Sequence, residues 1–496
     1  MTAFKYGWSC QLAMKPLDHR KILLIHPLGY GQKEAASDIS RTANIMPPLG
    51  LCSIASYLEE NGIKVEIVDF NAWPDSVQRL RSTLIHERPA YVGFSCTTSS
   101  FLDGVRLAEL AKQTLSGVNV VFGGVHVSSM GKKMMQEFKV IDFVVAGEGE
   151  ETLLELMQNR GDATGIFGLL FRDRSSGEVT SAGRRRTALN LDSLPYPAYD
   201  KLRGFPDSYT LPIFNYPAAP STSALSSRGC PYSCSYCDRS VFRKSYRYNS
   251  AEYIYGHMRY LNKRFRIKHI NFYDDQFTFN LKRIEKLTDM LSNQPLKMTF
   301  NCAVRSEHID RDLLKKLKMA GCWMISLGIE TGDQDLLQAL NRKVNLEQLA
   351  ERIRLIRGTG IRAKGLLMMG IPGETEESIE KTRQFLFSLP LNDFNLTKFT
   401  PFPGAPVYQS IQDYGEFDED WRRMDCMHFL FIPNGFKRER LEELYFSFYK
   451  QHFKRPGVLM DYVYMLWRSP DSWRRFMLNF YSFIGFARSG NRFRDD

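Results

Sequence analysis

Short apolar runs alternate with stretches of helical periodicity through the first third of the chain. The runs have the length of buried parallel strands, and helical segments separate them. They lie at Lys21–His26, Val65–Asp69, Tyr91–Ser95, Val118–Phe122 and Phe143–Ala146. This pattern predicts a doubly wound, Rossmann-like parallel sheet over residues 21–160, preceded by an N-terminal tail of residues 1–20.

A second alternating region follows a proline-rich connector, residues 161–220, which we interpret as an ordered linker with one strand at Gly168–Arg172. Over residues 221–410 six strand candidates alternate with helices. They are Ser223–Ser227, His269–Tyr273, Met298–Val304, Met324–Gly328, Lys364–Met369 and Phe394–Phe399. Six strand–helix units predict a partial (β/α)6, TIM-like barrel, in which chemistry takes place on the loops after the strands.

The pattern changes again in residues 411–496, which are helical, aromatic and basic. We expect a mainly helical C-terminal domain that packs on the barrel. An alternative is an amphipathic surface that contacts a membrane or a large apolar substrate.

Composition narrows the class of protein. The chain has 496 residues, of which 43% are hydrophobic and 24% charged, so disorder and low complexity are excluded. The formal net charge of +11 permits an anionic partner without requiring one, and we expect no nucleic acid. No window approaches the ~18 apolar residues of a membrane span, and the first residues lack a signal sequence. We therefore expect a cytoplasmic protein, with membrane association as the alternative.

Three of the nine cysteines, Cys230, Cys234 and Cys237, form a CxxxCxxC motif after the first predicted barrel strand. Thiolates at this spacing can hold one soft metal centre. A structural zinc usually needs a fourth Cys or His nearby, and none is present. Three thiolates on a cubane iron–sulfur cluster leave one iron open for a substrate or cofactor. We expect the other six cysteines to be ordinary buried thiols.

The carboxyl ends of the N-terminal strands carry glycines and polar side chains. These residues are Ser95, Thr97, Thr98, Gly123, Gly124, His126, Gly147 and Glu148. A single glycine pair is typical of a tight turn, but three such strand ends on one sheet edge favour a ligand site.

With the cysteine motif in this place, residues 221–410 resemble the radical S-adenosylmethionine (SAM) enzymes. The resemblance implies a [4Fe–4S] cluster on the three cysteines with SAM bound beside it. It further implies cofactor contacts at Tyr236, Asp274, Asp275, Asn301, Arg305, Glu330, Gly370 and Gly373. The segment Tyr-Asp-Asp-Gln-Phe, which contains both aspartates, departs from the commoner Gly-Gly-Glu pattern of that family.

The N-terminal sheet ahead of such a barrel is similar to the cobalamin-binding domain of the cobalamin-dependent radical SAM enzymes. Pro47–Leu51, Gly123–His126 and Gly147–Glu150 carry this likeness. The Asp-x-His-x-x-Gly loop that supplies a lower axial histidine in many cobalamin proteins is absent. The resemblance therefore implies a cobalt whose lower face is open or bound by water.

The resemblance implies methylation of an unactivated carbon in a biosynthetic small molecule or lipid, through a 5′-deoxyadenosyl radical and methylcobalamin. It also implies an external electron donor of the flavodoxin or ferredoxin type. Oxidative cyclisation or rearrangement, as in the cobalamin-dependent cyclase of bacteriochlorophyll synthesis, stays open. An RNA methylthiotransferase would carry a second cysteine triplet, and a non-enzymatic cobalamin sensor would not need a complete cluster motif.

Overall fold

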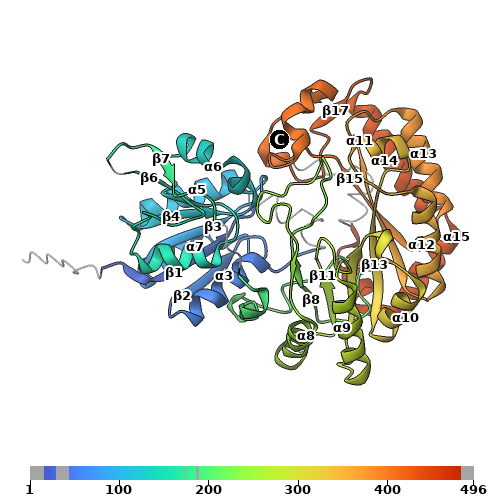
Figure 1. Cartoon of the computed structure of the whole chain (residues 1–496), viewed down its shortest axis with the longest axis horizontal. Coiled ribbons are helices and arrows are strands. Elements are labelled where there is room, and N and C mark those ends of the chain that lie inside the picture. Colours follow the sequence, from blue (N-terminus) through green and yellow to red (C-terminus); the bar gives the residue numbers. More distant parts are fainter. Residues whose placement is uncertain (1–15, 30–43, 174, 186–188, 482–496) are drawn as a thin grey trace, which may run out of the picture.

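The structure is a computed structural model that describes residues 16–29, 44–173, 175–185 and 189–481. Two curved sheets with their helices lie next to each other, and the C-terminal helices cover the second one (Figure 1). The α/β class and the Rossmann-like, half-barrel and helical parts predicted from the sequence are confirmed.

The N-terminal sheet has seven strands in the order β2-β1-β3-β4-β5-β6-β7. Its five parallel strands are β1 (Asp18–His26), β2 (Lys64–Asp69), β3 (Pro89–Ser95), β4 (Asn119–Gly123) and β5 (Phe143–Val145). Their connecting helices are α3 (Leu49–Glu60), α4 (Val77–Glu87), α5 (Phe101–Thr114), α6 (Val125–Glu137) and α7 (Glu150–Gln158). Helices α3 and α7 pack on one face of the sheet, and α4, α5 and α6 pack on the other.

Two antiparallel strands, β6 (Leu169–Arg172) and β7 (Val179–Ser181), extend this sheet beyond β5. They lie in the segment predicted as a linker, so the sheet is mixed and not purely parallel. The sequence pattern indicated β6 but not its pairing, and β7 is too short to show a period. The domain boundaries stay a prediction.

The second sheet is a half-barrel of six parallel strands in the order β15-β14-β13-β12-β11-β8. Its strands are β8 (Ser221–Ala224), β11 (His269–Phe272), β12 (Thr299–Val304), β13 (Cys322–Glu330), β14 (Arg362–Met369) and β15 (Asp393–Lys398). Helices α8 (Ala251–Phe265), α9 (Leu281–Asn293), α10 (Arg311–Met319), α11 (Gln334–Ala339), α12 (Leu346–Gly358) and α13 (Glu376–Ser388) lie between them in sequence. Five of the six strands lie within two residues of their predicted bounds, whereas β8 ends three residues before the predicted end at Ser227.

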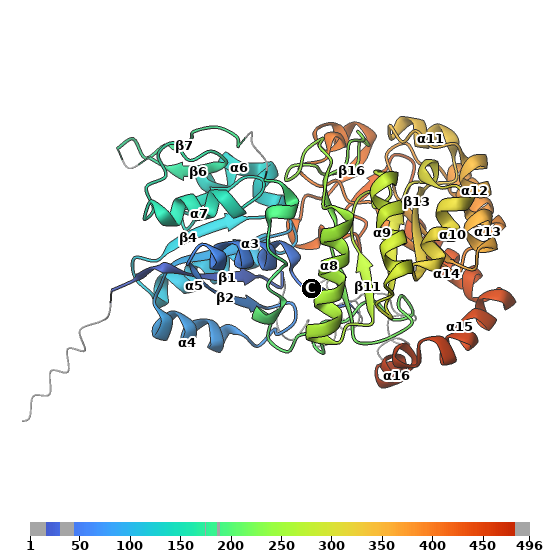
Figure 2. The same ribbon diagram turned by 60° about the horizontal axis from the view of Figure 1, so that its bottom comes forward.

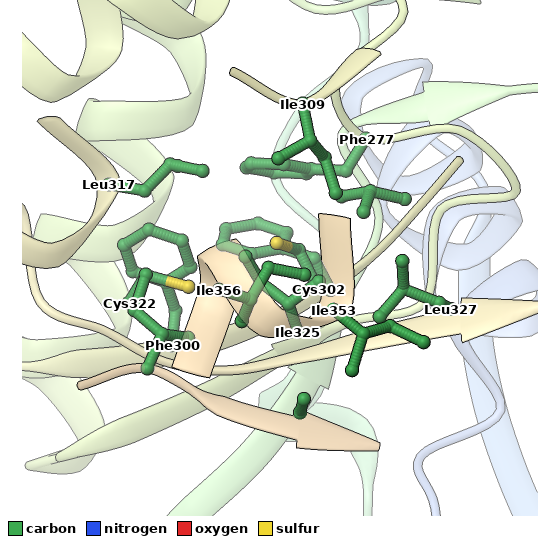
Figure 3. Packing of buried hydrophobic residues seen from close by; sticks show 14 of the residues in the cluster. Phe277, Phe300, Cys302, Ile309, Leu317, Cys322, Ile325, Leu327, Ile353 and Ile356 are labelled. Carbon is green, nitrogen blue, oxygen red and sulfur yellow. The ribbon is translucent and has the colours of Figure 1, made fainter. Parts of the chain in front are cut away.

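The core between the half-barrel and its outer helices is continuous and apolar. Phe300, Cys302 and Cys322 pack there against Leu317 of α10 and Ile353 of α12 (Figure 3). Cys52, Cys96, Cys302 and Cys322 are buried, as predicted, whereas Cys426 is half-buried. Cys10 lies outside the described residues.

The C-terminal part combines a small strand pair with three helices. Strands β16 (Gly415–Phe417) and β17 (Phe431–Pro433) pair antiparallel, which the sequence did not indicate because each has only three residues. The short helices η4 (Pro406–Tyr414) and η5 (Trp421–Arg423) flank β16. Helices α14 (Arg438–Phe453), α15 (Pro456–Arg468) and α16 (Pro470–Leu478) follow. Among the described residues, no helix combines the length and the apolar character needed to cross a membrane.

Candidate functional site

The segment after the cysteine motif lies on the carboxyl edge of the N-terminal sheet. The Ser240 hydroxyl donates a hydrogen bond of 3.2 Å to the carbonyl oxygen of Val125, directly after β4. The Val241 carbonyl oxygen lies 3.6 Å from the position that a Cβ of Gly147 would take, directly after β5. The loops that the sequence assigned to two different cofactors therefore meet at one interface.

The cysteine loop is held in place by backbone hydrogen bonds to the barrel. Ser235 donates to the Leu340 carbonyl at 3.0 Å, and Val407 donates to the Ser235 carbonyl at 3.0 Å. Cys234 is buried, and Cys230 and Cys237 are half-buried. Burial raises the pKa of Cys230, and it raises the pKa of Cys237 to about 12. The two thiols are therefore protonated unless a metal centre displaces their protons.

The donor set fits an iron–sulfur cluster. Within the part of the chain that the structure describes, no three His, Cys, Asp or Glu side chains converge as ligands of a single ion. A core of four irons is larger than one ion and holds its thiolate ligands further apart. Three soft thiols on one loop, with no fourth Cys or His in the motif, match such a cluster with one open iron.

The two aspartates after β11 have different surroundings. The Asp274 carboxylate is buried and accepts hydrogen bonds of 2.6 Å from the Ser226 backbone, the Ser226 hydroxyl and the Ser227 backbone. Its oxygens thus hold the chain just before the cysteine loop. The charge of Asp275 raises the pKa of both Cys230 and Cys237, so this carboxyl lies near their thiols. Of the two, Asp275 is the one placed to meet a ligand at the cysteines.

Tyr236 and Glu330, both half-buried, and the buried Arg342 form a polar group next to the cysteine loop. The Tyr236 hydroxyl is hydrogen-bonded to the Glu330 carboxyl, whose pKa is raised by burial and lowered by the Arg342 guanidinium, with burial dominant. Arg342 donates to the Gly328 carbonyl at 2.9 Å. A Cβ at Gly328 would lie 2.5 Å from a Glu330 oxygen and would displace that carboxyl group. Sequence reasoning missed Arg342, because no local motif marks it.

Asn301 lies in β12 of the half-barrel, and Arg305 directly follows that strand. The Arg305 guanidinium lies 3.8 Å from the centroid of the Tyr232 ring, and Arg305 Nε donates to Glu307 at 3.0 Å. Its positive charge lowers the pKa of Cys230 against the effect of burial. Asn301 donates to the Asn215 carbonyl at 2.6 Å, while its own amide oxygen is buried without a hydrogen-bond partner.

The turn after β14 carries the predicted glycines Gly370 and Gly373, with φ angles of 84° and 79°. The Glu374 carboxylate accepts from the backbone N–H groups of Gly370 at 2.5 Å and Ile371 at 3.3 Å. Burial outweighs these two hydrogen bonds and raises the pKa of Glu374 to about 8. The Phe429 ring lies 3.0 Å from the position of a Gly370 Cβ, so the turn is packed against the C-terminal part.

A cavity of about 160 Å³ lies between the two sheets, at the carboxyl edge of the N-terminal sheet. From this sheet it is lined by Ser95, Gly124, Gly147 and Glu148. Barrel residues such as Arg228 line it from the other side. The other four residues predicted at this edge, Thr97, Thr98, Gly123 and His126, do not line the cavity. Glycine backbone and a serine hydroxyl fit a corrinoid, whose flat ring needs close approach and whose amide groups need hydrogen-bond partners.

The side chain of His126 is buried at this edge and does not face the cavity. Its ring is 4.5 Å from that of Phe101 and 4.7 Å from that of Trp421, measured between centroids. Nδ1 lies 3.3 Å from the Thr98 hydroxyl, and the side chain is fully buried. Burial lowers the pKa of His126 to about 4, so the ring is neutral.

Comparisons with known proteins agree with this arrangement. The family model "Radical SAM superfamily" matches residues 225–386, and "B12 binding domain" matches residues 38–157. An uncharacterized methyltransferase, PH0819, of Pyrococcus horikoshii is 29% identical over 90% of this chain and 95% of its own length. The anaerobic magnesium-protoporphyrin IX monomethyl ester cyclase of Rubrivivax gelatinosus is 25% identical over 88% of this chain and 78% of its own.

The fold also matches a solved structure, the radical SAM methyltransferase TsrM of Kitasatospora setae with cobalamin and a [4Fe–4S] cluster bound. The TM-score is 0.64 at 18% identity, over 79% of this chain and 75% of that one. The B12-binding match spans β2 to β5 of the first sheet, and the radical SAM match spans β11 to β14 of the second. The chain therefore carries a radical SAM domain and a B12-binding domain, which imply a [4Fe–4S] cluster, SAM and cobalamin as its cofactors.

Proposed function

We propose that the enzyme is a C-methyltransferase that acts on an unactivated carbon of a small molecule or lipid-like substrate. One observation carries the proposal: the cysteine loop lies against the glycine-rich edge of the B12-binding domain through Ser240 and Val241. Methyl transfer needs the substrate carbon within reach of both cofactors, and a shared interface meets that need. The relative PH0819, a methyltransferase by name, supports the same reaction class.

We assign the holding of the cofactors to residues on both sides of this interface. When bound, the cluster with SAM supplies a radical that removes a hydrogen atom, and cobalamin supplies the methyl group. The three cysteines would hold the cluster, with Asp275 and the Tyr236–Glu330 pair beside it. Ser95 and Gly147 would meet the corrinoid from the cavity. Cys234 is buried and the other two cysteines are half-buried, which limits the access of water to reactive carbon centres.

Replacing Cys230, Cys234 and Cys237 together by alanine tests the cluster. We expect the variant, reconstituted anaerobically with iron, sulfide and hydroxocobalamin, to lose the cluster absorbance and SAM cleavage but to keep the corrinoid absorbance. Cys426→Ala is the matched control, since Cys426 is also half-buried but lies outside the motif. Retained SAM cleavage in the triple variant would refute the assignment of the three cysteines as cluster ligands. A wild-type protein that binds no corrinoid would refute the proposed methyl transfer from cobalamin.

Oxidative cyclisation is the second candidate reaction, because the Rubrivivax gelatinosus cyclase aligns with most of this chain. Product analysis separates the two reactions. Methylation forms S-adenosylhomocysteine and a product that is one methyl group heavier than the substrate. Cyclisation forms neither.

We also propose an external one-electron donor of the flavodoxin or ferredoxin type, because a reductive cleavage of SAM consumes one electron. Reduced flavodoxin or ferredoxin should support SAM cleavage in place of a chemical reductant. If neither does, the donor belongs to another class.

A third proposal concerns the outer face of α15, which we propose contacts an anionic lipid surface. The inner face of this helix buries Val458 and Met465. The outer face exposes a helical stripe that includes Met460 and Trp467, each 73% exposed. In Figure 2, α15 and α16 lie at the margin of the molecule, on the half-barrel side. The exposed Arg468 in the last turn of α15 adds positive charge that anionic headgroups attract.

Cosedimentation with vesicles tests this contact. We expect the wild type to bind phosphatidylglycerol-containing vesicles more strongly than pure phosphatidylcholine vesicles. Trp467→Asp should weaken the binding, and Met319→Asp, at an equally exposed position on the barrel, should not. Absence of vesicle binding, or a dimer that buries this face in solution, would refute the proposal.

A further inference from the structure

Four charged side chains bridge the two sheets on either side of the cysteine segment, residues 229–246. The arginines Arg228 and Arg247 lie opposite each other on the short antiparallel strands β9 (Ser227–Arg228) and β10 (Arg247–Tyr248). The carboxylates Glu148 and Glu150 lie after β5 of the N-terminal sheet and at the start of α7. We call these four residues the arginine–glutamate bridge.

Every link of the bridge crosses from one sheet to the other. Arg228 donates to Glu148 at 2.6 Å, to Glu150 at 2.7 Å and to the Ser53 hydroxyl at 2.9 Å. Arg247 forms an ion pair with the second Glu148 oxygen. Glu148 is therefore shared between both arginines, one on each carboxylate oxygen.

The bridge is mostly shielded from water. The side chains of Arg228 and Glu150 are only 14% and 5% exposed. Burial by itself would raise the pKa of Glu150, but the Arg228 charge and hydrogen bonds lower it below its usual value. Because shielded, multiply bonded charge pairs resist displacement more than surface pairs, the bridge fixes a geometry.

The bridge holds both ends of the segment that carries the three cysteines. Gly229 and Ser245 bring these ends together, because a Cβ at Gly229 would lie 2.4 Å from the Ser245 carbonyl oxygen. The middle of the segment rests on the same sheet edge through Ser240. The cysteine loop is thus anchored to the N-terminal sheet at its base, independently of its contacts with the barrel.

We infer that Glu148 and Glu150, acting through Arg228 and Arg247, are positioning residues that set the separation of the cluster from the corrinoid. This inference rests on the binding of both cofactors. It assigns to Glu148 a role that differs from the direct cofactor contact expected from the sequence. A shift of about 1 Å in a reacting geometry can cost on the order of 10²-fold in rate, so the bridge controls transfer efficiency.

Pulsed EPR on the holoenzyme tests the inference without knowledge of the substrate. Both the reduced cluster and cob(II)alamin are paramagnetic, so their spin–spin interaction reports the distance between them. We expect the wild type to give a narrow distribution of cluster-to-cobalt distances. In Arg228→Met and Glu148→Gln this distribution should be shifted or at least twofold broader. Iron and corrinoid contents are measured in every variant, and Arg247→Met, whose side chain does not line the cavity, should keep both at wild-type levels.

The controls separate positioning from general destabilisation and from cofactor contact. Lys112→Met removes the 2.7 Å pair with Asp142 within the N-terminal sheet and should leave the spin–spin interaction unchanged. If Arg228→Met does not fold, Arg247→Met, at a more exposed position, takes its place. An unchanged interaction in the bridge variants would overturn the inference. Loss of corrinoid in Glu148→Gln alone would do the same, since Glu148 would then bind the cofactor. If the chain does not bind the proposed cofactors at all, the wild type itself will lack the cluster or the corrinoid signal.

Discussion

Glu374 gives the turn after β14 a pH dependence that can be measured apart from catalysis. Its carboxylate is buried and bonded only to the backbone N–H groups of Gly370 and Ile371. Burial raises the pKa of Glu374 from the usual 4.5 to about 8. Between these two values the folded turn keeps a proton that an opened turn releases. The turn therefore becomes less stable as the pH rises through this window.

The size of the effect follows from the two pKa values. Each pKa unit corresponds to about 1.4 kcal/mol. Between pH 6 and pH 8 the Glu374 carboxyl of the opened turn is ionised, whereas that of the folded turn still holds most of its proton, so the free energy of opening changes over most of this range. We expect the free energy of opening the turn to fall by about 2 kcal/mol over this range, which is roughly a 30- to 50-fold change in the opening equilibrium. Glu374→Gln keeps an amide oxygen as acceptor for both N–H groups but cannot titrate, so this pH dependence should disappear.

Hydrogen exchange by mass spectrometry on the apoprotein measures the opening directly. The peptide that contains Gly370 and Ile371 is compared between wild type and Glu374→Gln at each pH, which cancels the intrinsic pH dependence of exchange. Glu376→Gln is the control, because Glu376 is exposed in the first turn of α13 and pairs with Arg440. Parallel pH profiles for wild type and Glu374→Gln would refute the argument that burial dominates the pKa of Glu374.

Three further changes test other parts of the structure. Asp274→Asn should weaken the charge-assisted hydrogen bonds from Ser226 and Ser227. We expect it to lower stability by roughly 1–3 kcal/mol in thermal unfolding and to reduce iron uptake. Unchanged iron uptake would contradict the role of Asp274 in holding the cysteine loop. His126→Gln should leave the EPR spectrum of bound cob(II)alamin unchanged, whereas loss of a nitrogen splitting would identify His126 as a cobalt ligand. Phe300→Ala should cost about 3–5 kcal/mol in chemical denaturation, and a cost below about 1 kcal/mol would contradict its fully packed position (Figure 3).

The parts of the fold that the sequence predicted are those with a local signal. Buried strands such as Tyr91–Ser95 are continuous apolar runs, and the half-barrel strands alternate with long periodic helices. The cysteine motif is equally local, since its chemistry depends on spacing within one loop. By contrast, β7, β16 and β17 have three residues each and show no period. Their pairing depends on the sheet edge that they meet and cannot be deduced from their own residues.

The residues that surround the site follow the same division. Glu330 and Gly370 could be singled out because motifs mark them, but Arg342 and Arg228 could not. An arginine in a loop has no pattern that names its partner, and Glu148 is 80 positions away from Arg228 in the sequence. Glu148 shows the converse, because the glycine-rich motif that contains it predicted a ligand, whereas the folded chain gives its carboxylate two arginines. Charge pairing across two sheets is a property of the tertiary structure alone.

The arginine–glutamate bridge joins the two halves of the site by charge, where an apolar interface could have supplied stability. Replacing buried ion pairs with apolar residues of similar volume is often neutral or stabilising, so stability alone does not explain such an interface. Charged hydrogen bonds differ from apolar contacts in having fixed directions, and Arg228 uses its two terminal nitrogens on two different carboxylates. An enzyme that must hold two cofactors at one substrate carbon gains from that directionality, because apolar packing tolerates sliding that a shared carboxylate does not.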